Sequence, residues 1–184
     1  MAAKHSEQVR LVEKLIGRVP ELRPFGPKSA GYALGFYDDY PDAGLRTTVT
    51  FGLAQQGGSM WRGLTLGTEL AMTIEGDSAA ADEMIQAAVL EDRQRLTTKE
   101  RRRIIEANGV FAPGYPPHLL FTNQASAAPE LLLRTKKAGD RYFNLMAAIP
   151  IDDIELRRYD RSVPDLIADL QDPTHVAKYP RASP

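Results

Sequence analysis

Hydrophobic residues recur along the first part of the chain with the spacing of an α-helix. Ser6 is a residue type that favours the N-cap of a helix. Apolar side chains then follow at intervals of three and four residues, which places them on one face: Val9, Val12, Leu15, Ile16 and Val19. Pro20 and Pro24 come directly afterwards, so we expect the helix to end before them.

The next three segments have the composition and alternation of β-strands. Segment 32–37 reads YALGFY, and segment 46–53 contains TTVTF, whose β-branched and aromatic residues favour strands. In segment 64–75, apolar residues at even positions share one face: Leu66, Leu70, Met72 and Ile74. The sequence DDYPDAG at 38–44 is typical of a turn. A glycine-rich stretch joins the second and third segments, which predicts a hairpin with a long connection.

The middle of the chain combines helical and strand patterns. A helical region is predicted from Ser78, with the apolar stripe Met84, Ile85, Ala88 and Val89. Thr97 and Glu100 fit a capping box, so a second helix is predicted from there through Ile104 and Ile105 to Asn108-Gly109. Two further strands are predicted, HLLF at 118–121 and ELLLR at 130–134.

The last third of the chain begins with its most apolar strand. Segment 141–151 contains FNLMAAI, and such a run is typical of a strand buried on both faces at the centre of a sheet. Asp152 or Asp153 fits the cap of a short helical turn. Ser162 fits the cap of a last helix, whose buried side consists of Val163, Leu166, Ile167 and Leu170.

This order of elements predicts an α+β fold in which helices cover a mixed, largely antiparallel sheet. We expect a single domain over residues 1–172 and a loosely ordered tail over residues 173–184.

Composition removes several functional classes. The chain has 184 residues, 43% hydrophobic and 26% charged, with a net charge of −1, so the whole molecule has no strong attraction to nucleic acid or acidic membranes. It contains no cysteine, which excludes disulfides, thiolate metal sites and a cysteine nucleophile. The N-terminal segment lacks the apolar core of a signal peptide, and no window resembles a membrane span. We therefore expect a cytoplasmic protein.

The glycine-rich stretch GLAQQGGS at 52–59 has the spacing of a phosphate-binding P-loop. Gly58 stands where such a loop needs lysine, and a β-rich segment follows where it needs a helix. We interpret the stretch as a connection between strands. The same connection continues to Gly63 and carries Trp61, the single tryptophan, which either packs against the sheet or contacts a partner together with Arg62.

Catalytic and metal-binding patterns are weak. The three histidines are His5, His118 and His175, and they match no zinc or serine-hydrolase motif. Turn and cap roles explain the paired carboxylates Asp38-Asp39 and Asp152-Asp153, although Asp38, Asp39 and Asp42 leave a divalent-cation site open. Two alternatives stay open: a small hydrolase using His118 with Glu69 or Asp38/Asp39, and a nucleic-acid binder using the basic residues of segment 93–103 (Arg93 to Arg103). A solvated helix face also explains that basic segment.

Several segments, taken in order, resemble the suppressor-of-fused-like domain family. They span residues 30–171 and read VTFGL at 49–53, GTELAMTI at 67–74, HLLFT at 118–122 and FNLMAAIPI at 143–151, followed by Glu155-Leu156 and the helix at 165–170. The loop after Phe51-Gly52-Leu53 and the stretch 78–108 differ from the family pattern.

The resemblance implies an α+β sandwich and a non-enzymatic, protein-binding role without a cofactor. In animals the family member holds zinc-finger transcription factors, whereas the bacterial single-domain members resemble immunity proteins that neutralise toxins. This chain is similar to the bacterial type, so a cognate toxin is one expected partner. We expect the contact surface to include Asp38, Asp39, Trp61 and Arg62, and we expect no catalytic residue and no metal site.

Overall fold

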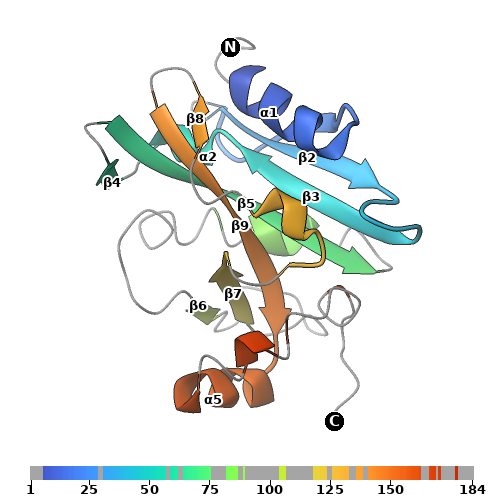
Figure 1. Ribbon diagram of the computed structural model, residues 1–184, viewed down its shortest axis with the longest axis vertical. Helices are drawn as coiled ribbons and strands as arrows, with labels where there is room; N and C mark the ends of the chain where they lie inside the picture. The colour runs from blue at the N-terminus through green and yellow to red at the C-terminus, as the bar shows by residue number, and fades with distance from the viewer. Residues whose placement is uncertain are drawn as a thin grey trace.

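The computed structural model gives an α+β architecture built on one long, twisted sheet (Figure 1). The structure describes residues 6–28, 31–56, 59–61, 64–75, 82–86, 89, 104–106, 118–123, 126–132, 136–138, 141–162, 166–168, 170 and 177. The side chains of 6, 55–56, 59–61, 64–66, 104–106, 136–138, 141 and 159–161 lie outside that description.

The helices of the described part are α1 (Ser6–Ile16), α2 (Leu53–Gln56), a helical segment at 82–86, the 3₁₀ turn η1 (Pro129–Leu131) and α5 (Asp153–Arg161), with further helical residues at 166–168. The strands are β1 (Glu21–Phe25), β2 (Tyr32–Asp38), β3 (Leu45–Phe51), β4 (Ser59–Trp61), β5 (Leu64–Glu75), β6 (Ile104–Glu106), β7 (His118–Thr122), β8 (Lys136–Ala138) and β9 (Arg141–Ile151).

Within the described ranges, the strands follow the order β1-β2-β3-β5-β9-β7-β6, while β4 pairs with β5 and β8 with β9. The pair β5–β9 is parallel and the other pairs are antiparallel. The expected mixed, largely antiparallel sheet is therefore confirmed. The prediction that segment 141–151 forms the central strand is also confirmed, because β9 lies between β5 and β7.

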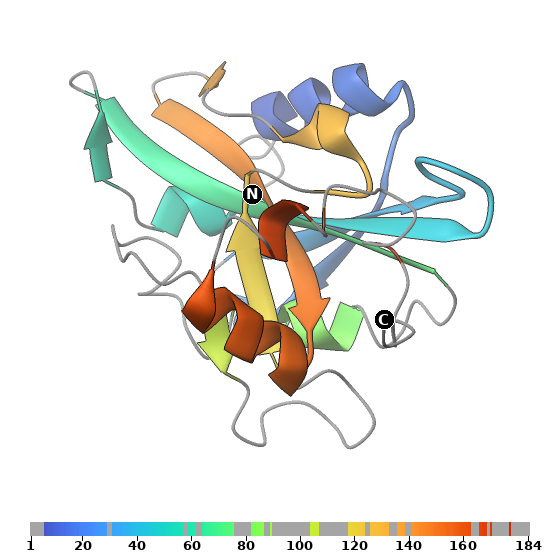
Figure 2. The same ribbon diagram turned by 60° about the horizontal axis from the view of Figure 1, so that its bottom comes forward.

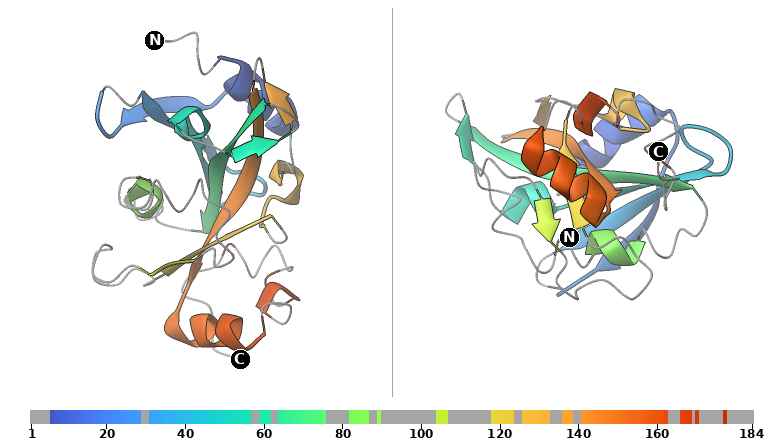
Figure 3. Two further views of the ribbon diagram at one scale, coloured as in Figure 1. Left: turned by 90° about the vertical axis from the view of Figure 1, so that its left-hand side faces the viewer. Right: turned by 90° about the horizontal axis from the view of Figure 1, so that it is seen from below.

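Helices cover both faces of this sheet. The segment at 82–86 lies on one face, where Met84 and Ile85 pack with Met72 and Phe121. On the other face α1 and η1 lie over the β2–β3 half, and Val12 belongs to that second core cluster. Figure 2 shows α1 and η1 above the sheet and the 82–86 helix below it, and Figure 3 shows α5 at the far end of β9.

The N-terminal helix is confirmed but ends earlier than its apolar stripe. Val9 and Val12 are buried, whereas Leu15 is partly exposed. Gly17 adopts a left-handed φ of 75° and donates its N–H to Glu13 O over 2.7 Å, which terminates the helix. Val19 is 81% exposed, so its assignment to the buried stripe is wrong.

Two of the predicted elements are wrong. Residues 104–106 were expected to be helical, but they form β6, which pairs Ile104 with Leu120 of β7. β-Branched isoleucines suit a strand, so pairing with β7 overrides the local capping signal. The segment 130–134 was expected to be a strand, but Pro129 starts the η1 turn and buries Leu131 beneath α1. Residues 97–103 and 133–134 lie outside the described part.

The edge strand β1 has no counterpart in the sequence prediction. Pro24 lies inside it, and proline within an apolar run argues against a strand unless the strand is at an edge. At the other end of the chain, Asp152 and Glu155 form a capping box that starts α5, which confirms the predicted cap. The helix is longer than the expected short turn.

The C-terminal region is described in part. Leu166, Ile167 and Leu170 are buried against β9, as the predicted apolar side requires, and Leu166 N–H donates to Ser162 O over 3.3 Å. In the expected tail, the structure describes Ala177, which is 1% exposed and packs in the same cluster.

Candidate functional site

A buried carboxyl group organises the connection between β3 and β5. The side chain of Glu69, in β5, is 1% exposed. Its Oε1 accepts hydrogen bonds from the N–H groups of Gly52 at 2.9 Å and Ala54 at 3.0 Å. Its Oε2 accepts from the Thr50 hydroxyl at 2.8 Å and from Leu53 N–H at 3.3 Å. We call this arrangement the Glu69 latch, because it ties the start of α2 to β5.

The latch lies where β5 changes its neighbouring strand. β3 pairs with the part of β5 from Ala71 to Glu75. β4 pairs with the beginning of β5, from Leu64 to Leu66. Between them, Thr50 Oγ1 accepts a hydrogen bond from Leu70 N–H over 2.8 Å and thereby satisfies backbone that has no strand partner on this side. The side chain of Thr50 therefore takes the place of a strand partner at Leu70, and Glu69 binds Thr50 and the N–H groups that follow it.

Two glycines make the close approach of α2 to β5 feasible. Gly52 has a φ of 96°, a conformation that side chains with a Cβ rarely adopt. A Cβ on Gly67 would lie 2.2 Å from the backbone oxygen of Ala54, so only glycine fits there. The Phe51-Gly52-Leu53 and Gly67-Thr68-Glu69 segments, both part of the sequence resemblance, thus meet in one structural unit.

The electrostatics of the latch combine two opposing influences. Burial raises the pKa of Glu69 to about 8, and the hydrogen bonds from Ala54, Thr50, Gly52 and Leu53 act in the lowering direction. The backbone N–H groups at the start of α2 are the kind that cradle a phosphate in a P-loop. Here they bind the carboxyl group of Glu69, which agrees with the interpretation of the glycine-rich stretch as a connection between strands.

The turn between β2 and β3 carries Asp38 and Asp39. Asp39 has a φ of 51°, and its Oδ1 accepts from Gly44 N–H over 2.9 Å. The Arg18 guanidinium donates to the backbone oxygens of Asp38 at 3.0 Å and Asp39 at 3.1 Å. The Asp38 side chain is 74% exposed and lies 3.4 Å from Arg46 Nε. Among the described residues no three histidine or carboxylate side chains converge in a metal-binding group, the site considered at Asp38, Asp39 and Asp42 included.

A second charged cluster joins this turn to the 82–86 helix. Asp82 accepts from the Thr48 hydroxyl over 2.8 Å and pairs with Arg46 Nη2 over 3.3 Å. The Arg46 and Arg23 guanidinium carbons lie 4.4 Å and 4.8 Å from the centre of the Phe36 ring. Burial raises the pKa of Asp82, whereas the hydrogen bond from Thr48 and the charge of Arg46 act to lower it. Sequence inspection missed this cluster because its members come from separate elements.

The structure places two of the expected contact residues, Asp38 and Trp61, at different levels of the sheet. Asp38 pairs with Arg46 of β3, which in turn pairs with Ile74 of β5. Trp61 pairs with Leu64 of β5. Ten residues of β5 separate these levels, which corresponds to about 33 Å along an extended strand. Figure 1 shows β4 and the β2–β3 turn at opposite ends of the sheet. The Trp61 side chain and Arg62 lie outside the described part.

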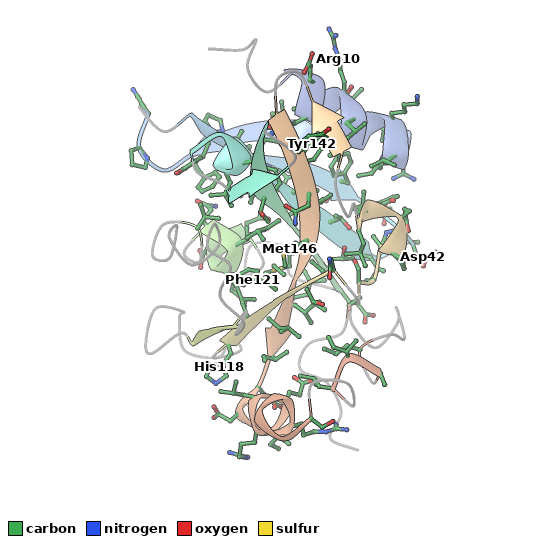
Figure 4. The ribbon with its side chains drawn as sticks, turned by 60° about the vertical axis from the view of Figure 1, so that its left-hand side comes forward. Arg10, Asp42, His118, Phe121, Tyr142 and Met146 are labelled. Carbon is green, nitrogen blue, oxygen red and sulfur yellow. The ribbon has the colours of Figure 1, made fainter. Side chains whose placement is uncertain are left out.

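His118 is the first residue of β7 and lies beside α5 (Figure 4). Its side chain is 9% exposed, and Nε2 lies 2.8 Å from Asp153 Oδ1. The other ring nitrogen, Nδ1, is buried and has no hydrogen-bond partner among the described residues. A catalytic base must reach the proton that it removes, whereas Nδ1 of His118 is buried and Nε2 contacts Asp153.

The partners considered for His118 in a hydrolase lie far from it. His118 pairs with Ile151 of β9 and Glu69 with Leu145, six residues away, or about 20 Å along the strand. Asp38 belongs to β2, four positions from β7 in the strand order, or about 19 Å across the sheet. The basic segment 93–103 lies outside the described residues.

Comparison with known proteins identifies the fold. No family model matches the chain, and no curated protein matches it. A chain of the crystal structure of the Sufu–Fu complex is similar with a TM-score of 0.66 and a probability of 1.00. The match covers 97% of this chain and 91% of that chain, at 13% sequence identity. The chain has a suppressor-of-fused-like fold. At this identity the likeness establishes the architecture, and the expected fold is confirmed.

The suppressor-of-fused-like fold explains why the resembling segments lie where they do. The VTFGL and GTELAMTI segments form β3, β5 and the latch between them, and FNLMAAIPI forms most of β9. The role of Glu69 was the main feature missed from the sequence. An isolated acidic residue inside an apolar strand was the available signal, since a buried charge needs partners. In the described part of the chain, no helix is long and apolar enough to cross a membrane.

Proposed function

We propose that the protein is a non-enzymatic protein-binding module. The observation that carries this proposal is the likeness, over 97% of the chain, to a chain of the Sufu–Fu complex, a structure of two proteins bound to each other. The alternative hydrolase draws no support from the described residues, because His118 faces Asp153 and lies far from Glu69 and Asp38.

We further propose an immunity-type role, in which the protein binds and neutralises a toxin. The sequence resemblance to bacterial single-domain members supports this class of partner. A neutralising protein gains affinity from surfaces that are already ordered before binding, because less conformational entropy is then lost.

The proposed contact region centres on the β4 end of the sheet, with Trp61 and Arg62. The Glu69 latch supports this choice, because it fixes α2, which leads directly into β4. Tryptophan and arginine are the residue types most often found at the energetic centres of interfaces. Asp38 and Asp39, at the opposite end of β5, form a separate and secondary contact region.

Co-purification with the product of the neighbouring gene tests the function, followed by calorimetric titration of the isolated pair. We expect Trp61→Ala to weaken binding at least about tenfold with an unchanged melting temperature, as for an interface centre. Asp38→Ala/Asp39→Ala should have a smaller effect. Arg10→Ala, on the exposed side of α1, is the control and should bind normally.

Three results would reject the proposal. One is the absence of a specific protein partner across a range of salt concentrations. Another is normal binding by Trp61→Ala. The last is turnover of esters, phosphoesters or nucleotides that disappears in His118→Ala, which would support the hydrolase instead.

A further inference from the structure

In the described part of the chain, β1 is an edge strand with one side unpaired. Within the described part it pairs only with β2, and its residues from Glu21 to Pro24 are exposed. Apolar side chains lie beside this edge: Leu22 is 47% exposed and Val19 is 81% exposed. An exposed edge strand is a template for pairing with another strand, and proline is one device that limits such pairing.

Pro24 indicates which backbone groups of β1 face outward. Proline has no N–H, and in edge strands its nitrogen lies on the solvent side. Backbone groups alternate in direction along a strand, so Leu22, two residues before Pro24, directs its N–H and C=O outward as well. The free edge therefore offers one complete donor–acceptor pair, at Leu22, and Pro24 limits the extent of the pairing.

The charges on either side of Leu22 are complementary to those of a second, antiparallel copy of the same strand. Glu21 and Arg23 lie on one face of the strand and form an ion pair of 2.9 Å within the chain. When two copies of β1 lie antiparallel about a two-fold axis at Leu22, Glu21 of each copy faces Arg23 of the other. An axis at Glu21 or at Arg23 instead places like charges opposite each other, which is destabilising.

We propose that this edge binds a second copy of the chain, with β1 pairing antiparallel to β1 about a two-fold axis at Leu22. Leu22 of each copy exchanges two hydrogen bonds with the other, and the positions opposite Pro24 are occupied by Pro20, which has no N–H to leave unpaired. If the pairing continues outward, Val19 lies opposite Phe25 of the second copy. The surface is self-complementary, as a two-fold interface requires.

The contact is small, so the dimer is weak. Its strand holds five residues, which places the buried area below the roughly 1,200 Å² of stable interfaces. We expect a dissociation constant of roughly 0.1–1 mM, as for weak transient contacts.

Sedimentation equilibrium from low micromolar concentration up to about 1 mM, the upper end of the expected range, tests the proposal. Arg23→Glu places Glu21 opposite a second glutamate at both positions and should weaken the dimer about tenfold. The exchange Glu21→Arg/Arg23→Glu restores opposite charges across the axis and should restore the wild-type dissociation constant. Arg10→Glu changes the net charge equally on α1 and should have no effect.

Leu22→Pro is the independent variant. It removes the outward N–H at the axis without changing any charge, and it should abolish the dimer while β1 keeps its pairing with β2. Melting curves verify that each variant is folded. The proposal is overturned by a protein that stays monomeric throughout the concentration range. It is also overturned by a charge exchange that remains as weak as Arg23→Glu, or by normal dimerisation of Leu22→Pro.

Discussion

Glu69 should make the stability of this protein depend on pH in an unusual direction. The ordinary pKa of a glutamate carboxyl group is 4.5, and burial raises the pKa of Glu69 to about 8 in the folded protein. The folded state therefore binds this proton more tightly than the unfolded state does. Its contribution to stability is fully present below pH 4.5 and is lost as the pH rises towards 8.

The size of the effect follows from the difference between the two pKa values, 8 minus 4.5, or about 3.5. Each pKa unit corresponds to about 1.4 kcal/mol, so the free energy of unfolding should fall by up to about 5 kcal/mol over this range. This value exceeds most surface effects and is a large part of the total stability of a typical domain, which is about 5–15 kcal/mol.

Urea unfolding at a series of pH values between 5 and 9 measures the effect, with Glu69→Gln beside the wild type. Glutamine does not titrate, so the difference between the two proteins isolates the carboxyl group. The variant should be less stable at pH 5 by about 1–3 kcal/mol, because an amide satisfies the latch donors less well. Its disadvantage should shrink as the pH rises. Glu75→Gln, in the same strand but exposed, is the matched control and should follow the wild type.

A wild-type stability that is constant or rises relative to Glu69→Gln between pH 5 and 9 would refute this reasoning. Such a result would mean that the hydrogen bonds from Thr50, Gly52, Leu53 and Ala54 outweigh burial and keep Glu69 ionised.

Three further substitutions test the contacts described above, each by chemical or thermal unfolding. Gly67→Ala should cost about 1–3 kcal/mol, because the new Cβ meets backbone of α2; combined with Glu69→Gln it should cost less than the sum, since both release the same contact. Asp152→Ala should cost about 1 kcal/mol through loss of the α5 cap, whereas Asp152→Asn should recover most of it. Tyr40→Phe should cost about 1 kcal/mol by removing its hydrogen bond to Glu130, and adding Glu130→Gln should cost little more.

Strong local patterns carried most of the fold prediction. Segment 64–75 was predicted as a strand from its alternation of apolar residues, and segment 141–151 from its long apolar run. Both segments are strands in the structure, because patterns of that length admit few alternatives. The cap at Asp152 was also readable, because a capping box needs only residues that are close in sequence.

Short segments were predicted poorly because their conformation depends on distant partners. Ile104 is in a strand because Leu120 pairs with it, and Leu131 is in a 3₁₀ turn because α1 covers it. β1 depends on β2 in the same way, and its proline is tolerated only because no strand lies on the other side within the described part.

The candidate site was the least predictable part. Asp38, Asp39, Trp61 and Arg62 were selected because they lie near the ends of predicted strands. Strands end on two opposite sides of the sheet, and the sequence does not say on which side each residue lies. Sequence inspection also grouped Glu69 with His118, although the register places them about 20 Å apart.

The sequence by itself determined the α+β class and the central position of β9, because apolar periodicity and hydrophobic runs report burial directly. It also determined that the glycine-rich stretch lacks the lysine of a phosphate loop. Tertiary structure alone decided what that stretch does. Its first N–H groups bind the carboxyl group of Glu69, 17 residues away from Gly52 along the chain, where β5 exchanges one neighbouring strand for another. Such a contact depends on strand register and on the approach of Ala54 to Gly67, and neither is visible in local sequence.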